Sequence, residues 1–118
     1  MTTDLEEHNK QVVARFFEAV GGGNLHLLDE LVAEDYIQHN PQAGQGREGV
    51  RQFFEKMLPM PDFGEETVHF IAEGDLVVRQ SISRFGMLVD IFRVQDGKLQ
   101  EHWDAHRADP DSDPLPGF

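Results

Sequence analysis

Residues 89–104, VDIFRVQDGKLQEHWD, decide how the rest of the sequence is interpreted. Apolar and polar residues alternate on both sides of the segment 95–97, Gln-Asp-Gly, which predicts two antiparallel strands joined in a hairpin. The sequence places these strands at residues 87–94 and 99–108. Successive side chains of a strand point to opposite faces, so the length of the loop decides which polar residues share a face.

Two registers of this hairpin are compatible with the loop. A two-residue turn puts Asp90 on one face and both His102 and Asp104 on the other. A three-residue loop pairs Val94 with Lys98. It places Asp90 opposite His102, with Asp104 diagonal to Asp90 and about 7 Å away. We favour the three-residue loop because it gathers the carboxylates and imidazoles on one face and leaves the other face apolar, with Val89, Ile91, Leu99, Trp103 and Ala105.

The first half of the chain contains apolar residues at three- and four-residue steps, a period typical of amphipathic helices. A capping box formed by Thr3 and Glu6 begins the first helix, and the glycines 21–23 end it. A second, shorter helix is predicted from Asn24 to about residue 35.

A third helix follows a short extended stretch at residues 36–39. Pro59 and Pro61 end this helix, whose apolar side chains are Val50, Phe53, Phe54, Met57 and Leu58. From Glu66 the period changes to two, and Gly74-Asp75 joins the first two strands of a sheet.

Helices followed by a meander of strands predict an α+β fold, in which three N-terminal helices pack on a curved antiparallel sheet that encloses a pocket. The predicted domain covers residues 1–108. Residues 109–118 are polar and rich in proline, so we expect an extended or disordered tail that Leu115 and Phe118 could anchor.

The charge balance narrows the classes of partner. The 118 residues include 22 acidic and 10 basic side chains, a net charge of −12, so the surface repels a phosphate backbone and we expect no nucleic-acid partner. No stretch reaches the roughly 18 apolar residues of a membrane span, and the N-terminus lacks the basic region of a signal peptide. These features predict a cytoplasmic protein without a membrane partner. The chain has no cysteine, which excludes thiol catalysis and disulfides.

Three segments carry a resemblance to a known family: residues 36–41, YIQHNP; residues 74–78, GDLVV; and the hairpin 89–104. They resemble the SnoaL-like polyketide cyclase family of the nuclear transport factor 2-like superfamily, with a match from the first helix to about Ala108. The resemblance implies a cone-shaped α+β fold in which three helices close one side of a curved sheet over a deep pocket. It also implies a homodimer, for which the apolar outer face of the hairpin offers a contact.

The resemblance also implies an activity. Characterised members close polyketide rings by intramolecular aldol condensation without metal or cofactor, and Asp104 matches the aspartate that acts as their base. Asp90 stands where the cyclases have a histidine, so the acid that assists the carbonyl oxygen differs here. We expect Asp90 to share a proton with Asp104 and to donate it to the developing enolate oxygen.

The function predicted from these residues is a cofactor-independent acid–base enzyme for a small apolar carbonyl compound, either an aldol cyclase or an isomerase. The alternative is a non-catalytic small-molecule-binding or dimerisation module with the same fold. Charged residues are also typical of the solvated face of a sheet, so the polar face alone does not separate the two.

Other residues are expected to complete the pocket. Tyr36 and Gln38 alternate with His39, so only one set can point inward; we favour His39 as a third catalytic residue, with Asn40 beside it. The predicted substrate-binding residues are His102, Asn40, Tyr36, Phe54 and Phe92.

A metal site is a further possibility that the residue types raise. The run His102-x-Asp104-x-His106 puts three possible ligands on one strand face, and His39 could complete the set. The resemblance to a metal-free family favours a carboxylate that pairs with an imidazole, so neither a metal nor a cofactor is predicted.

Overall fold

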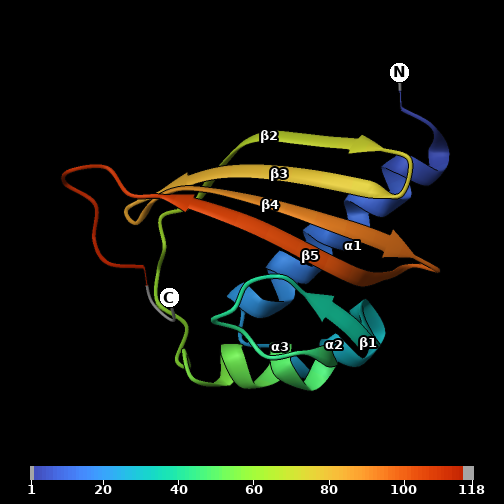
Figure 1. The fold of residues 1–118 in the computed structure, drawn as a ribbon, viewed down its shortest axis with the longest axis horizontal. Coiled ribbons are helices and arrows are strands. Elements are labelled where there is room, and N and C mark those ends of the chain that lie inside the picture. Colours follow the sequence, from blue (N-terminus) through green and yellow to red (C-terminus); the bar gives the residue numbers. More distant parts are fainter. Residues whose placement is uncertain (1, 116–118) are drawn as a thin grey trace.

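The computed structural model describes residues 2–115, which form an α+β fold of short and long helices packed on a five-stranded sheet (Figure 1). The fold class predicted from the sequence is confirmed. The elements in chain order are α1 (Asp4–Gly21), a 3₁₀ turn (Leu25–Leu27), α2 (Leu28–Leu31), β1 (Val32–Gln38), α3 (Gly46–Glu55), β2 (Glu66–Glu73), β3 (Leu76–Ser83), β4 (Gly86–Gln95) and β5 (Lys98–Arg107).

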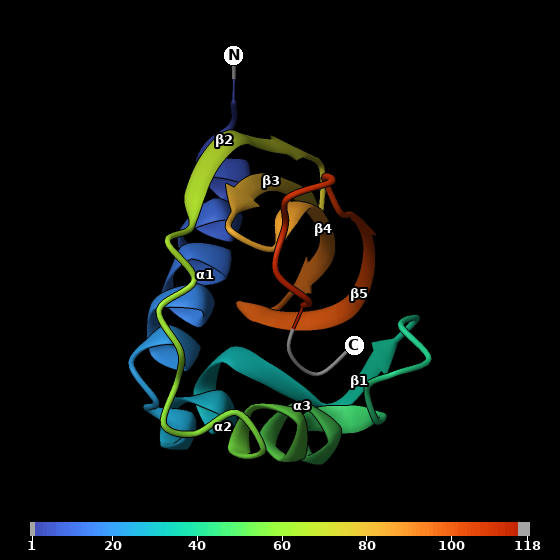
Figure 2. The ribbon, with the colours of Figure 1, turned by 90° about the vertical axis from the view of Figure 1, so that its left-hand side faces the viewer.

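The sheet has the strand order β1-β5-β4-β3-β2, and its neighbours are antiparallel except β1, which runs parallel to β5. Figure 2 shows the strongly curved sheet, with α1 along one side and α2, α3 and β1 below it. The concave face of the sheet therefore looks toward the helices, and side chains from both line an interior space.

Helix α1 begins with the predicted capping box. The Thr3 hydroxyl accepts a hydrogen bond from the backbone of Glu6, and the Glu6 carboxylate accepts one from the backbone of Thr3. Its other carboxylate oxygen accepts a hydrogen bond from the backbone of Gly74 at 2.7 Å. One side chain thus both starts the helix and ties it to the β2–β3 turn.

The second helix is shorter than the sequence predicted. It ends at Leu31, and β1 begins at Val32, so the predicted continuation to residue 35 is wrong. Val32 pairs with Leu99 of β5, and its carbonyl accepts a hydrogen bond from Arg47 Nε at 2.9 Å. These partners lie far along the chain, so local helical periodicity was overridden by tertiary pairing.

The β4–β5 hairpin has the predicted faces but not the predicted loop. Gln95 pairs with Lys98 across a two-residue turn, and both turn residues, Asp96 and Gly97, have positive φ. A bulge at Gln100 then shifts the register by one residue, because Arg93 pairs with Glu101 while the next residue, Val94, pairs with Leu99. A two-residue turn plus one bulged residue restores the face pattern that a three-residue loop would produce.

The bulge changes two details of the prediction. Asp90 lies directly opposite Asp104, and Phe92, not Asp90, lies opposite His102. Leu99, which precedes the bulge, is fully buried in the core beside Val94 and not on the outer face as predicted.

Two irregular segments, residues 56–65 and the tail from Ala108, meet at one end of the sheet (Figure 1). The backbone of Arg84 in the β3–β4 turn donates to Phe63 of the first segment and accepts from Asp113 of the tail. Leu115 lies at the wall of the interior space, as its predicted anchoring role requires, whereas Phe118 lies outside the described residues. In the described part of the chain, no helix has the length and apolar character needed to cross a membrane.

Candidate active site

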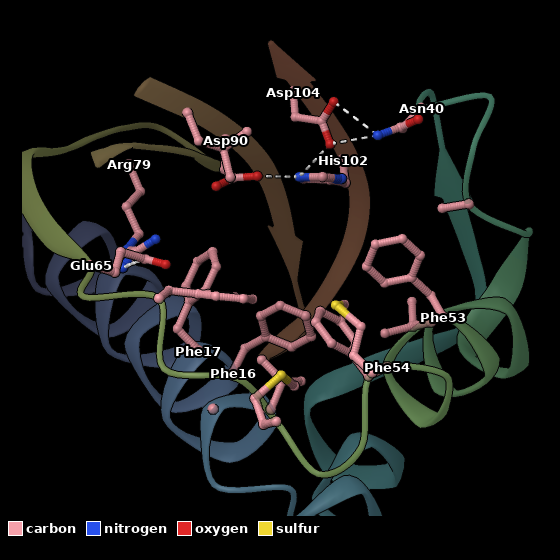
Figure 3. A pocket seen from close by; sticks show the side chains of 18 of the residues that line it. Phe16, Phe17, Asn40, Phe53, Phe54, Glu65, Arg79, Asp90, His102 and Asp104 are labelled. Carbon is pink, nitrogen blue, oxygen red and sulfur yellow. Dashed lines mark hydrogen bonds and ion pairs between the residues drawn. The ribbon is translucent and has the colours of Figure 1, made fainter. Parts of the chain in front are cut away.

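The interior space is a cavity of about 580 Å³, within the range of small-molecule sites. Helices α1 and α3, four strands, the segment 56–65 and the tail all contribute to its wall. Its floor is mostly aromatic, and polar side chains gather along its roof (Figure 3). The aromatic lining residues include Phe16, Phe17, Tyr36, Phe53, Phe54 and Phe92.

Three charged residues form a single row across the concave face of the sheet. Arg79 of β3 pairs with Asp90 of β4, and Asp90 pairs in turn with Asp104 of β5. Each step between neighbouring strands is about 4.8 Å. All three side chains line the cavity, so the two carboxylates lie close together and the cation lies on the far side of Asp90.

His102 joins the two carboxylates. Its Nε2 lies 2.8 Å from Asp90 Oδ1 and 3.8 Å from Asp104 Oδ2. The residue His102 is 7% exposed, and Asp90 is 4% exposed. The imidazole ring is stacked against Phe92, with a centroid distance of 4.5 Å, and against Tyr36 at 6.5 Å. Burial and stacking hold the ring in one orientation.

The second ring nitrogen of His102 determines where a proton must lie. Gln38 Oε1 accepts a hydrogen bond from the backbone N–H of Asn40 at 3.1 Å, which orients the Gln38 amide. The same oxygen lies 2.8 Å from His102 Nδ1, so Nδ1 must carry a hydrogen. The contact between Nε2 and Asp90 Oδ1 then needs one further proton, which sits on either the imidazole or the carboxyl group.

Asp104 differs from this pair, because its carboxylate oxygens face a hydrogen-bond donor. Asn40 Nδ2 lies 3.2 Å and 3.1 Å from the two carboxylate oxygens of Asp104. The Asn40 amide is oriented by its own oxygen, which accepts a hydrogen bond from the backbone N–H of Gln42 at 2.8 Å. Asp104 therefore faces a fixed hydrogen-bond donor, which matches the acceptor oxygens of a carboxylate.

Tyr36 lies deep in the same cluster and is 3% exposed. Burial, and after it the negative charges of Asp90 and Asp104, raise the pKa of the Tyr36 hydroxyl well above its usual value near 10; an interaction with Gln38 offsets this in part. Tyr36 is thus a neutral hydroxyl group at the pocket wall at physiological pH.

His39 lies outside the cavity, so the prediction that it points inward is wrong. Its ring stacks on Trp103 at 4.8 Å, and its Nε2 lies 2.7 Å from Glu101 Oε2. The residues that point inward from this stretch of chain are Tyr36, Gln38 and Asn40, spaced at the period of two expected of an extended chain.

All predicted site residues except His39 line the cavity, among them Phe54 and Phe92, while their roles stay predictions. Sequence reasoning assigned neither Gln38 nor Arg79 to the pocket. The common spacing of Tyr36, Gln38 and Asn40 was the signal that could have found Gln38.

The cluster also brings together atoms that are able to bind a cation. One ligand atom each from Asp90, His102 and Asp104 lies within 4.8 Å of the others. This set differs from the one considered from the sequence, because His39 lies outside and His106 Nε2 contacts the carbonyl of Phe85 at 2.6 Å.

Comparisons with known proteins place the chain in a family. Residues 13–102 match the model of the SnoaL-like domain, and no curated protein is significantly similar to the chain. TsrD from Streptomyces laurentii is 24% identical, with a TM-score of 0.68 over 89% of this chain and 90% of that one.

Two further solved structures share the fold at lower identity. A protein from Jannaschia sp. CCS1, named for its likeness to SnoaL-like polyketide cyclases, is 22% identical, with a TM-score of 0.73 over 89% of each chain. An epoxide hydrolase of the LEH-like type from M. tuberculosis is 16% identical, with a TM-score of 0.72 over 86% of this chain and 84% of that one. At these identities the likeness shows a common fold, the nuclear transport factor 2-like fold. With its match over residues 13–102, the chain belongs to the SnoaL-like domain family.

Proposed function

We propose that the protein is a cofactor-independent acid–base enzyme that acts on a small, mostly apolar carbonyl compound by aldol cyclisation or isomerisation. One observation carries the proposal: two backbone N–H groups orient the amides of Gln38 and Asn40, and these amides give the two pocket carboxylates different proton requirements. Asp104 faces a donor, whereas the Asp90–His102 pair must hold a proton. A base and an acid therefore stand side by side.

Asp104 is the base. Its side chain is 13% exposed and lines the cavity, and Asn40 holds both of its oxygens in place. A carboxylate in this position removes a proton from the carbon next to a substrate carbonyl, and the electron pair of the broken C–H bond forms the enolate. The fixed Asn40 donor keeps the carboxylate oriented through this step.

The Asp90–His102 pair is the acid. The second carboxyl oxygen of Asp90, Oδ2, is buried and has no hydrogen-bond partner within residues 2–115. A buried polar atom without a partner is costly, and an oxygen-bearing substrate group beside it would relieve that cost. In an aldol closure the enolate carbon attacks a second carbonyl of the same molecule, and the proton of the pair is transferred to the new alkoxide.

The cavity wall supports an apolar substrate body. The rings of Phe16, Phe17 and Phe54 pack edge to face below the polar roof, and Phe92 meets both Phe16 and Phe17. Such a wall binds a ring or unsaturated chain through apolar contact while the carbonyl oxygens remain at the roof. A small ketone is therefore a suitable probe.

Proton abstraction can be tested without knowing the natural substrate. We expect the protein to accelerate the exchange of the α-protons of 2-tetralone in D₂O, followed by ¹H NMR, and expect Asp104→Asn to slow that exchange by about 10²- to 10⁴-fold. Asp35→Asn is the matched control, because Asp35 lies on β1 outside the cavity. Its exchange rate should equal that of the wild type.

The alternative, a non-catalytic binding module, predicts a different result. In that case 2-tetralone would shift the amide resonances of pocket residues without any acceleration of exchange, and Asp104→Asn would leave both binding and exchange unchanged. That outcome would contradict the proposal that the protein is an enzyme.

A homodimer is part of the same proposal. Exposed apolar side chains lie on the sheet strands β2 and β3, where Val68, Ile71 and Ile82 are 44%, 56% and 45% exposed. Burial of such side chains against a second copy would remove apolar surface from water. Sedimentation as a stable monomer would contradict the dimer and leave the chemistry untouched.

A further inference from the structure

Arg79 is a partly buried cation in the wall of the cavity. It extends from β3 on the concave face, and its side chain is 11% exposed. The guanidinium carbon lies 3.9 Å from the ring centroid of Phe17 on α1. Within the described residues that line the cavity, Arg79 is the one arginine or lysine. A positive charge in a small, mostly apolar cavity is energetically unfavourable unless a negatively charged group pairs with it.

The partner that Arg79 has in this structure uses only part of the guanidinium. Glu65 Oε1 forms an ion pair with Nη2. Arg79 Nη1 is buried and has no hydrogen-bond partner within residues 2–115. A guanidinium offers two parallel N–H donors that match the two oxygens of one carboxylate. The Glu65 contact leaves half of that fork unsatisfied.

We infer that the pocket binds a compound that carries a carboxylate, and that this carboxylate takes the place of Glu65 on Arg79 and pairs with both Nη1 and Nη2. Glu65 already shows that a carboxylate fits against this guanidinium. It belongs to the irregular segment 56–65, and its side chain is 22% exposed, so on displacement its charge would move toward water. The exchange of one carboxylate for another keeps the charge balance and satisfies the unpaired donor.

The position of Arg79 also orients the rest of the ligand. Arg79, Asp90 and Asp104 occupy one row across three neighbouring strands, so the backbone positions of Arg79 and Asp104 are roughly 10 Å apart. Figure 3 shows Arg79 and Glu65 on one side of the pocket, Asp104 and Asn40 on the other, and Asp90 between them. A keto acid with an apolar body between its carboxylate and its reacting carbonyl fits this arrangement.

This inference rests on the proposed function for the identity of the reacting carbonyl, but carboxylate binding can be measured without turnover. Isothermal titration calorimetry at pH 7 with 4-phenylbutanoate and its methyl ester isolates the contribution of the carboxylate. We expect the acid to bind the wild-type protein at least tenfold more tightly than the ester. Equal affinity for the two compounds, or no binding of the acid, would overturn the inference.

Variants of the ion pair localise the effect. Arg79→Gln should abolish the preference for the acid, and a preference that persists in this variant counts against the inference. Glu65→Gln removes the competing carboxylate, so the acid should bind this variant severalfold more tightly than it binds the wild type. Glu66→Gln is the matched control, because it makes the same change at the next residue, which is exposed on β2, and should leave the affinity unchanged.

Glu65→Gln keeps the test decisive if Arg79→Gln does not fold. Unchanged affinity of Glu65→Gln for the acid would show that Glu65 and the ligand do not compete for Arg79, which overturns the inference. Asp104→Asn separates the two proposals. It should retain the preference for the acid while it loses proton exchange, so failure of one proposal leaves the other standing.

Discussion

The protein contains two histidine–carboxylate pairs of nearly the same geometry on opposite faces of one strand. Inside the cavity, His102 Nε2 lies 2.8 Å from Asp90 Oδ1; outside, His39 Nε2 lies 2.7 Å from Glu101 Oε2. Each imidazole stacks on an aromatic ring, Phe92 at 4.5 Å or Trp103 at 4.8 Å. The side chains of the inner pair are 9% and 6% exposed, and those of the outer pair are 42% and 19% exposed.

The difference between the pairs shows that contact distance alone does not determine what a pair does. Water reaches the outer pair and can solvate either partner, so the net contribution of this pair to stability is small. The inner pair is largely shielded from water. Gln38 occupies the second nitrogen of His102, and the pair must therefore hold a proton between its own atoms. Burial converts the same contact from a surface ion pair into a group that can transfer a proton.

Removal of the imidazole of the inner pair should have the largest effect on stability, and removal of the imidazole of the outer pair is the comparison. His102→Gln leaves the Asp90 carboxylate buried without its partner, and we expect it to lower the free energy of unfolding by about 3–5 kcal/mol. His39→Gln removes an exposed pair and should lower it by roughly 1 kcal/mol or less. Urea unfolding of the two variants, monitored by circular dichroism, measures both losses.

A second substitution identifies the cause of the inner loss. Asp90→Asn in the His102→Gln background removes the uncompensated charge, so the double variant should recover part of the lost stability. Equal losses in the two single variants, or no recovery in the double variant, would mean that burial does not distinguish the pairs.

A smaller loss of stability should appear at alkaline pH, and it involves Tyr36 beside the inner pair. The pKa of Tyr36 in the folded protein is raised above its unfolded value near 10. The unfolded chain therefore loses this proton first, so the associated stability is complete below pH 10 and is lost as the pH rises toward the folded pKa. The loss is at most about 1.4 kcal/mol per pH unit.

Tyr36→Phe should remove this alkaline loss, which urea unfolding between pH 9 and pH 11 would reveal. Tyr36 is the one tyrosine of the chain, so the phenolate absorbance of the wild-type protein titrates this side chain alone. A folded protein that ionises its tyrosine near pH 10 would contradict the buried, negatively charged surroundings.

The hairpin shows how far such a site can be predicted from the sequence. Face assignment depends only on whether the total offset of the loop and any bulge is odd or even. The three-residue loop predicted from the polar pattern and the observed two-residue turn with a bulge at Gln100 have the same parity, so Asp90, His102 and Asp104 share a face in both. The sequence contains no strong local signal for the bulge, which is why the predicted cross-strand partner of Asp90 was wrong.

The orientation of His39 could not be derived from its neighbours in the chain. The face that β1 turns inward is set by its parallel pairing with β5, more than 60 residues away, where the backbone of His39 donates to the carbonyl of His102. Chemistry alone favoured the histidine, whereas the spacing of Tyr36, Gln38 and Asn40 favoured the other face. The ion pair of Arg79 was equally inaccessible, because its partner Glu65 lies in a segment without periodicity.

The smallest expected change in stability involves the outer pair and occurs at acid pH. The hydrogen bond to His39, and after it the one to Arg93, lowers the pKa of Glu101 in the folded protein. A depressed folded pKa contributes stability that is present above the unfolded value of about 4.5 and is lost as the pH falls through the folded value. Glu101→Gln should therefore unfold at a lower urea concentration than the wild type at pH 6, by less than His102→Gln, and the difference should vanish toward pH 3. His39→Gln should remove most of this acid dependence while Glu101 remains in place, because His39 is its main cause; an unchanged acid dependence in that variant would assign it to Arg93 instead.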